Sequence, residues 1–217
     1  MIISEDKSFE RMPENLTFEQ AAASIEGAHY AYNMINKVNL EKGQKVLVNG
    51  ATGAIGSAAV QFLKYYGAVI TAVCKGKDTD LIKSLGADRV IDYTKEDFTK
   101  EDKTYSYIFD TVGKSSFGKC KHLLQTAGIY ISSELGFLAQ NLFFAIFKPF
   151  TGAKKVVFPV PLDCKRSIIL IKELISKGEF KAVIDKKYPL DKIVDAYNYV
   201  EKGQKIGNVV ITVEHNN

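Results

Sequence analysis

A turn with glycine at every third position constrains the fold of this chain more than any other feature. Residues 46–49 form a short apolar, β-branched run, and Gly50, Gly53 and Gly56 follow it. Small and apolar residues at helical spacing then continue over residues 54–66. This order predicts a strand, a tight turn and a helix, which together make the first half of a βαβ unit.

The residue types in this turn suit a site for phosphate groups. Gly50 can adopt the backbone angles that a sharp exit from a buried strand requires. Gly53 has no Cβ, so a pyrophosphate can approach its backbone, where the N–H groups and positive end of the next helix favour an anion. Gly56 lets the helix lie against its strand. The spacing is G-x-x-G-x-x-G rather than G-x-G-x-x-G, so an ordinary βα turn that binds nothing is the alternative.

Length and composition favour a soluble globular protein with one sizeable domain. The chain has 217 residues, is 46% hydrophobic and carries a formal net charge of +4. Its lysines are scattered singly, which argues against nucleic-acid binding. Cys74, Cys120 and Cys164 are far apart, so we expect neither a disulfide framework nor a zinc site. We find no signal peptide and no bilayer-spanning stretch, and expect a cytoplasmic protein without membrane contact.

Strands and helices alternate along the chain. Apolar and β-branched runs predict strands at residues 46–49, 68–74, 89–92, 107–110 and 128–132, and further extended segments at 156–161, 182–185, 188–190 and 208–213. Periodicity and capping residues predict helices at 17–38 (broken near Gly27), 54–66, 80–85, 115–124, 135–147, 165–176 and 192–202, with Asp163 and Asp191 as caps of the last two. This rhythm predicts an α/β fold, a Rossmann doubly wound parallel sheet with flanking helices, whose ligand site lies beyond the carboxyl ends of the strands.

The end of the second expected strand indicates which dinucleotide would bind. A site for NAD places an acidic residue there, which binds the ribose hydroxyls. Here Lys75 and Lys77 occupy this stretch, so a 2′-phosphate fits better and NADP(H) is favoured. Asp78 keeps NADH as the alternative, and both lysines could instead be solvated.

Longer motifs run in order over nearly the whole chain, at residues 12–22, 49–56, 84–93, 109–113 and 207–213. In these motifs the chain resembles the medium-chain dehydrogenase/reductase superfamily, in its zinc-independent quinone oxidoreductase-like (alcohol dehydrogenase-like) branch. The resemblance implies a Rossmann domain at residues 25–178, with remnants of a second, mostly β lobe at both termini: residues 1–24, and a strand-helix-strand return segment at 179–217. Most of that N-terminal catalytic lobe would be missing from this chain, so no catalytic residue is named.

The resemblance also implies the cofactor contacts. The glycine turn would hold the pyrophosphate, Lys75 or Lys77 the 2′-phosphate, and Tyr93 the adenosine end. Residues 110–112 would line the inner ribose, and three polar residues would lie near the nicotinamide. The implied set is Gly50, Ala51, Thr52, Gly53, Ala54, Ile55, Gly56, Lys75, Lys77, Tyr93, Asp110, Thr111, Val112, Ser132, Ser133 and Asn208, with no metal ligand.

Two functions are consistent with this resemblance. The first is an NADP(H)-dependent reductase that transfers hydride from NADPH to a small-molecule quinone or to an activated alkene or carbonyl. The second is a non-catalytic NADP-binding domain, acting as a cofactor sensor or an assembly partner. Association, including homo-oligomer formation, could use exposed terminal strands or the Phe-rich helix at 135–150.

The glycine turn also resembles that of extended short-chain dehydrogenases, which need a Tyr-x-x-x-Lys pair on one helix face. Tyr188 and Lys192 have this spacing. Because Pro189 disfavours helical angles at Tyr188, the two residues are not expected to share a helix face.

Overall fold

A six-stranded, fully parallel sheet forms the centre of the molecule. The computed structural model describes residues 10–133, 153–160, 162 and 164–213. The strands of the sheet are β1 (Lys45–Asn49), β2 (Val69–Cys74), β3 (Arg89–Asp92), β4 (Tyr105–Asp110), β5 (Leu124–Ser132) and β6 (Lys155–Val157). Their order is β3-β2-β1-β4-β5-β6. This is the order of a Rossmann fold, which confirms the predicted fold class and puts the reversal of strand order between β1 and β4.

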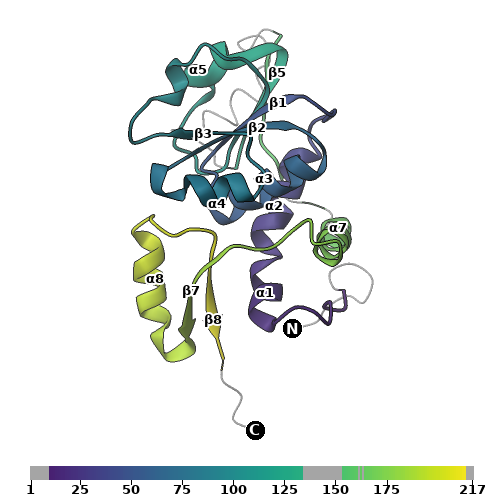
Figure 1. The fold of residues 1–217 in the computed structure, drawn as a ribbon, viewed down its shortest axis with the longest axis vertical. Helices are drawn as coiled ribbons and strands as arrows, with labels where there is room; N and C mark the ends of the chain where they lie inside the picture. The colour runs from purple at the N-terminus through teal and green to yellow at the C-terminus, as the bar shows by residue number, and fades with distance from the viewer. Residues whose placement is uncertain (1–9, 134–152, 161, 163, 214–217) are drawn as a thin grey trace.

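Helices cover both faces of this sheet (Figure 1). One face packs against α2 (Glu26–Ile35), α3 (Ala54–Tyr65) and α4 (Thr79–Ser84), and α7 (Cys164–Ser176) joins the same core beside α2. The other face packs against α5 (Phe117–Cys120) and the 3₁₀ turn Lys121–Leu123. Both faces of this parallel sheet are apolar, and the helices of its crossover connections cover them.

The first strand shows how the sequence produces two cores. Successive side chains of a strand point to opposite faces. Val46 and Val48 therefore pack with α2 and α3, whereas Leu47 packs with Phe117 on the other side. All three strand residues are fully buried, and each such burial stabilises the fold by roughly 1.5–3 kcal/mol.

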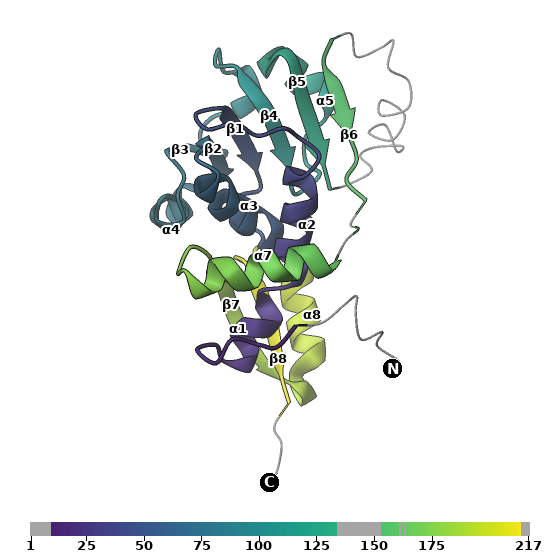
Figure 2. The same cartoon turned by 90° about the vertical axis from the view of Figure 1, so that its right-hand side faces the viewer.

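The remaining elements form a second, smaller unit at the other end of the molecule, with α7 lying across the space between the two (Figures 1 and 2). Strands β7 (Ile184–Pro189) and β8 (Asn208–Thr212) pair in parallel as a separate two-stranded sheet. Helix α8 (Ile193–Glu201) connects them, and α1 (Phe18–Ala23) packs beside β8. The ends of the described chain thus meet in one unit.

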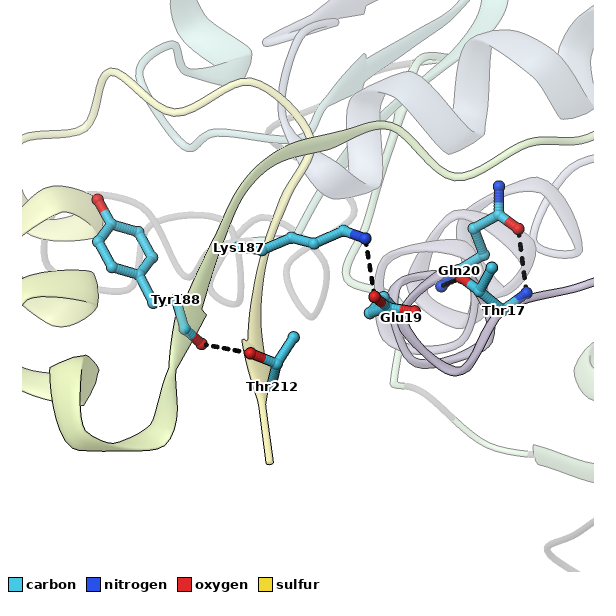
Figure 3. A network of polar contacts seen from close by, with 6 residues as sticks. All are labelled: Thr17, Glu19, Gln20, Lys187, Tyr188 and Thr212. Atoms are coloured by element: carbon cyan, nitrogen blue, oxygen red, sulfur yellow. Dashed lines mark hydrogen bonds and ion pairs between the residues drawn. The ribbon is translucent and has the colours of Figure 1, made fainter. Parts of the chain in front are cut away.

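Figure 3 shows the polar contact that fastens α1 to this unit, together with the cap of α1. The Thr17 hydroxyl accepts a hydrogen bond from the Gln20 backbone N–H, and the Gln20 side-chain oxygen accepts one from the Thr17 backbone N–H. Lys187 of β7 donates to Glu19 over 2.8 Å. Within the sheet, the Thr212 hydroxyl donates to the carbonyl of Tyr188 over 3.3 Å.

Several element boundaries differ from the predictions. The first helix breaks at residues 24–25 rather than near Gly27. The helix predicted over 115–124 ends early because Leu124 already pairs with Tyr105 in the sheet. Residues 190–192 form a 3₁₀ turn that includes Asp191, and Lys192 is the N-cap of α8. The predicted helix at 135–147, the Phe-rich stretch to residue 150 and the Asp163 cap lie outside the described residues.

Two further expectations can be compared with the structure. Tyr188 lies in β7 and Lys192 in the following 3₁₀ turn, so the pair shares no helix face, as predicted. In the described part of the chain, no helix has the length and apolar character needed to cross a membrane.

Candidate functional site

A cleft of about 740 Å³ opens beyond the carboxyl ends of β1 and β4. This is where a doubly wound sheet binds its ligand, and the volume is in the range of small-molecule sites. Ten of the sixteen residues expected at the site line the cleft: Gly50, Thr52, Gly53, Ala54, Ile55, Tyr93, Thr111, Val112, Ser133 and Asn208. The other six, Ala51, Gly56, Lys75, Lys77, Asp110 and Ser132, do not.

The three glycines of the turn differ in whether the fold requires a glycine at their position. Gly50 has a φ of +82°, and a Cβ there would lie 2.8 Å from Cβ of Val112. A Cβ on Gly56 would lie 2.1 Å from the Gly50 carbonyl oxygen. The fold alone therefore requires glycine at these two positions. At Gly53, φ is −69° and a Cβ would make only an ordinary 3.5 Å contact, so the fold does not require glycine at this position.

The start of α3 supplies hydrogen-bond donors to the cleft. Gly53 is its N-cap and offers no side-chain acceptor, and no acidic residue occupies the first turn. The first N–H groups of a helix have no partner within the helix, and its dipole makes this end positive. Ala54 and Ile55 line the cleft at this end. The local chemistry is that of an anion-binding site.

Asp110 organises the loop after β4 instead of facing the cleft. Its side chain is fully buried and accepts hydrogen bonds from the Asn49 amide (3.0 Å), the Gly113 and Ser115 backbone (3.0 and 3.1 Å) and the Tyr130 hydroxyl (2.8 Å). The carboxylate therefore positions the loop, and the expected place of this residue beside the inner ribose stays a prediction.

The same loop is tied to the glycine turn. The Thr111 hydroxyl donates to the carbonyl of Asn49 over 2.8 Å, and its backbone N–H donates to the same oxygen over 3.0 Å. Thr111 and Val112 are thereby held at the cleft wall. Hydrogen bonds thus join the end of β1, where the glycine turn begins, to the loop after β4.

The two serines after β5 differ in position. Ser132 is fully buried and absent from the cleft wall, and its expected contact with the nicotinamide stays a prediction. Ser133 lines the cleft, and its hydroxyl oxygen is buried without a hydrogen-bond partner among the described residues. An unpaired buried hydroxyl is costly unless a ligand or water satisfies it.

The region expected to select the dinucleotide lies beside the cleft. Lys75 and Lys77 follow β2 directly but are not part of the cleft wall, and Lys77 is exposed. Tyr93 lines the cleft. Asp78, the acid that kept NADH as an alternative, is 8% exposed. Hydrogen bonds from Thr94 lower the pKa of the neighbouring Asp92 carboxyl, which is therefore ionised at neutral pH.

Sequence reasoning missed a second wall of the cleft. Glu26, Gly27 and Tyr30 come from α2, and Val200, Gly203 and Lys205 come from α8 and the segment after it. Asn49, Phe98 and Lys114 complete the lining. In the sequence, only Gly203 and Gly207, on either side of Lys205, could have marked part of this wall. The other contacts depend on how distant elements pack.

The two buried cysteines are not reactive groups. Burial raises the pKa of the Cys74 and Cys120 thiols to about 11, so both are protonated and unreactive at neutral pH. All three cysteines are free. The described ranges contain no group of three or more His, Cys, Asp or Glu side chains that could hold a metal ion, and we derive no step through a metal.

The strand order, with a glycine turn and the start of α3 at its switch point, defines a Rossmann fold. Residues 85–211, more than half of the chain, match the model of the family described as zinc-binding dehydrogenase. The chain belongs to this family, which is part of the medium-chain dehydrogenase/reductase superfamily.

Relatives agree with this assignment. A 2-methylene-furan-3-one reductase from Solanum lycopersicum is 31% identical over 211 residues, which are 95% of this chain and 50% of the relative. The mitochondrial NAD(P)H oxidoreductase RTN4IP1 of Mus musculus is 30% identical over 227 residues, covering 93% of this chain and 57% of the relative. The chain thus spans little more than half the length of these proteins.

Solved structures show the same fold. The quinone oxidoreductase from Coxiella burnetii superposes with a TM-score of 0.83 at 22% identity, covering 93% of this chain and 63% of the other. At this identity the likeness speaks for the fold alone. Because one named relative is mitochondrial, the cytoplasmic location stays a prediction.

Proposed function

We propose that this chain binds NADPH and is the cofactor-binding half of a reductase acting on a quinone, an activated alkene or a carbonyl compound. The observation that carries the proposal is the uncapped start of α3, which opens into a cleft at the β1/β4 switch point. Two further features fit a dinucleotide there: the space on the cleft side of Gly53 and the unpartnered Ser133 hydroxyl. Relatives named as NAD(P)H oxidoreductases and as an enone-type reductase support the reaction class.

Each part of the site would have a separate task. The backbone of residues 52–55 would bind the pyrophosphate, and Thr111, Val112, Ser133 and Asn208 would orient the inner ribose and nicotinamide. Tyr93 would lie by the adenosine, with Lys75 or Lys77 meeting the 2′-phosphate from beside the cleft. When bound, the nicotinamide supplies the hydride, so this chain needs only to bind and orient it. We also propose that the protein works without zinc and lies in the cytoplasm.

The domain organisation is part of this proposal. We place the boundary of the Rossmann domain at residues 25 and 178 and give 179–217 to the return segment, because the six-stranded sheet lies before residue 178 and the two-stranded sheet after it. Residues 1–24 would belong with a catalytic lobe that supplies most substrate contacts. Association through terminal strands or through residues 135–150 stays a prediction.

The test is a titration of the purified chain with NADPH and NADH, followed by calorimetry and nicotinamide fluorescence. We expect saturable binding with tighter affinity for NADPH. Gly53→Asp should weaken NADPH binding at least about tenfold, because it adds an anion where a phosphate would bind. Since a Cβ at this position clashes with nothing, the melting temperature should stay close to that of the native chain. Absence of saturable binding in the native chain would refute the proposal.

A second pair of variants tests the choice of dinucleotide. Replacing both Lys75 and Lys77 by alanine should weaken NADPH binding and leave NADH binding unchanged. The matched control replaces Lys100 and Lys103, which are exposed and lie away from the cleft wall, and should affect neither. Equal loss of both dinucleotides in the Lys75/Lys77 variant would assign the lysines to another role.

Turnover separates the reductase from its alternative. Oxidation of NADPH on addition of a quinone or enone would support the reductase. Binding without oxidation would favour a non-catalytic NADP-binding domain that acts as a sensor or an assembly partner.

A further inference from the structure

One lysine of the second cleft wall reaches the glycine turn from the far end of the chain. The Lys205 ammonium donates to the carbonyl oxygen of Gly207 over 2.6 Å. Gly207 is itself bound to the turn, because its N–H donates to the carbonyl of Thr52 over 2.6 Å and it pairs with Gly53 in a β-bridge. Lys205 is therefore held beside the start of α3, and it lines the cleft there.

This placement is electrostatically unfavourable in the protein alone. The N-terminal end of a helix is positive, so a cation beside it is repelled, and acidic residues are the usual neighbours. The first turn of α3 carries none. Lys205 is also partly buried, which disfavours its charged form.

The nearby charges compensate only in part. Burial lowers the pKa of the Lys205 ammonium, while the carboxylates of Asp185 and Glu26 act in the opposite direction. Within the residues that the structure describes, its one hydrogen bond is to the Gly207 carbonyl, although an ammonium has three donors. A cation and a helix N-terminus that face one cleft are complementary to an anion between them.

We propose that Lys205 is a phosphate-binding residue of this cleft, which contacts the pyrophosphate of the bound dinucleotide together with the N–H groups of the first turn of α3. This inference rests on the proposed function and adds a charged contact from the C-terminal segment. It differs from the expected role of Lys75 and Lys77, which follow β2 and would meet the 2′-phosphate. The alternative is that Lys205 only fastens the segment to its own Gly207 carbonyl.

Ligand fragments can locate the contact. The full chain is titrated with NADPH, with ADP-ribose, which has the pyrophosphate but no nicotinamide, and with 2′-AMP, which has neither. Lys205→Met should weaken NADPH and ADP-ribose binding about tenfold or more, as expected for a lost charge-assisted hydrogen bond, and leave 2′-AMP binding unchanged. The salt dependence of NADPH binding should decrease as well, because one cation no longer contacts phosphate.

Two other variants separate charge from structure. Lys205→Gln can keep the hydrogen bond to Gly207 but lacks the charge, so it should lose affinity like Lys205→Met while its melting temperature stays closer to native. Lys202→Met removes an exposed cation at the end of α8 and should leave binding of all three ligands unchanged.

The outcomes distinguish this inference from the proposed function. If the native chain binds NADPH and the Lys205 variants bind ADP-ribose equally well, the phosphate contact is refuted and the proposed function stands. A loss of affinity shared by 2′-AMP, together with a lowered melting temperature, would also refute the contact and indicate a structural clamp. If the native chain binds no dinucleotide, both proposals fall.

Discussion

The two sheets of this molecule are stabilised in different ways. The strands of the six-stranded sheet are covered on both faces, and side chains such as Leu47 and Phe109 are fully buried. In the β7–β8 unit, Val194 and Tyr197 of α8 are each 67% exposed, and Ala196 is the one buried residue of that helix. The first region thus buries its apolar side chains, whereas the second exposes apolar surface and is joined to α1 by the Lys187–Glu19 ion pair, which salt and pH can weaken.

The largest effect is expected from overpacking the first region. Gly56→Ala would place a methyl group 2.1 Å from the Gly50 carbonyl oxygen, so α3 would have to move away from the sheet. We expect the free energy of unfolding to fall by about 3 kcal/mol, measured by urea denaturation. Gly118→Ala is the matched control, because a Cβ there meets nothing closer than 4.0 Å. A native-like Gly56→Ala protein would mean that the β1–α3 packing is looser than described.

A smaller loss is expected when the buried carboxylate is changed. Asp110→Asn replaces an acceptor by an amide that must face N–H donors from Gly113 and Ser115, and we expect a loss of roughly 2 kcal/mol in the free energy of unfolding. The exposed Asp102, changed to asparagine, serves as control. If Asp110→Asn were as stable as the control, the carboxylate would not organise the loop.

The smallest effect is expected in the second region. The hydrogen bond from Lys187 lowers the pKa of the Glu19 carboxyl from 4.5 to about 2. The Lys187–Glu19 ion pair therefore stabilises the folded β7–β8 unit above pH 4.5, and this stabilisation is lost as the pH falls towards 2. Glu19→Gln lacks this contribution at every pH.

Amide hydrogen exchange can detect a small change in the stability of the β7–β8 unit. At neutral pH, Glu19→Gln should speed exchange in β7 and β8 slightly, and the difference from the native chain should vanish as the pH approaches 2. The six-stranded sheet should not respond. Glu14→Gln, at an exposed position, is the control. A difference that persists at low pH would assign the effect to something other than the ion pair.

The sequence was sufficient where neighbouring residues determine the structure. The β1–turn–α3 unit was predictable because strand, glycine spacing and helix follow one another within some twenty residues. The burial of Asp110 was not, since its partners Asn49 and Tyr130 come from other strands. Likewise, α2 and Lys205 join the cleft wall only through tertiary packing. Local patterns therefore gave the fold and one wall of the site, and long-range contacts decided the other wall.

The hydrogen bond from Gly207 to Thr52 has a consequence for biosynthesis. A ribosome adds about 5–20 residues per second, so the glycine turn emerges roughly 8–30 seconds before the residue that fastens it. During that interval the nascent chain has the glycine turn and α2, but not the part of the second wall that comes from α8 and the segment after it. The cleft is completed only after residues 200–208 have been synthesised, so its completion should follow, rather than guide, the folding of the six-stranded sheet.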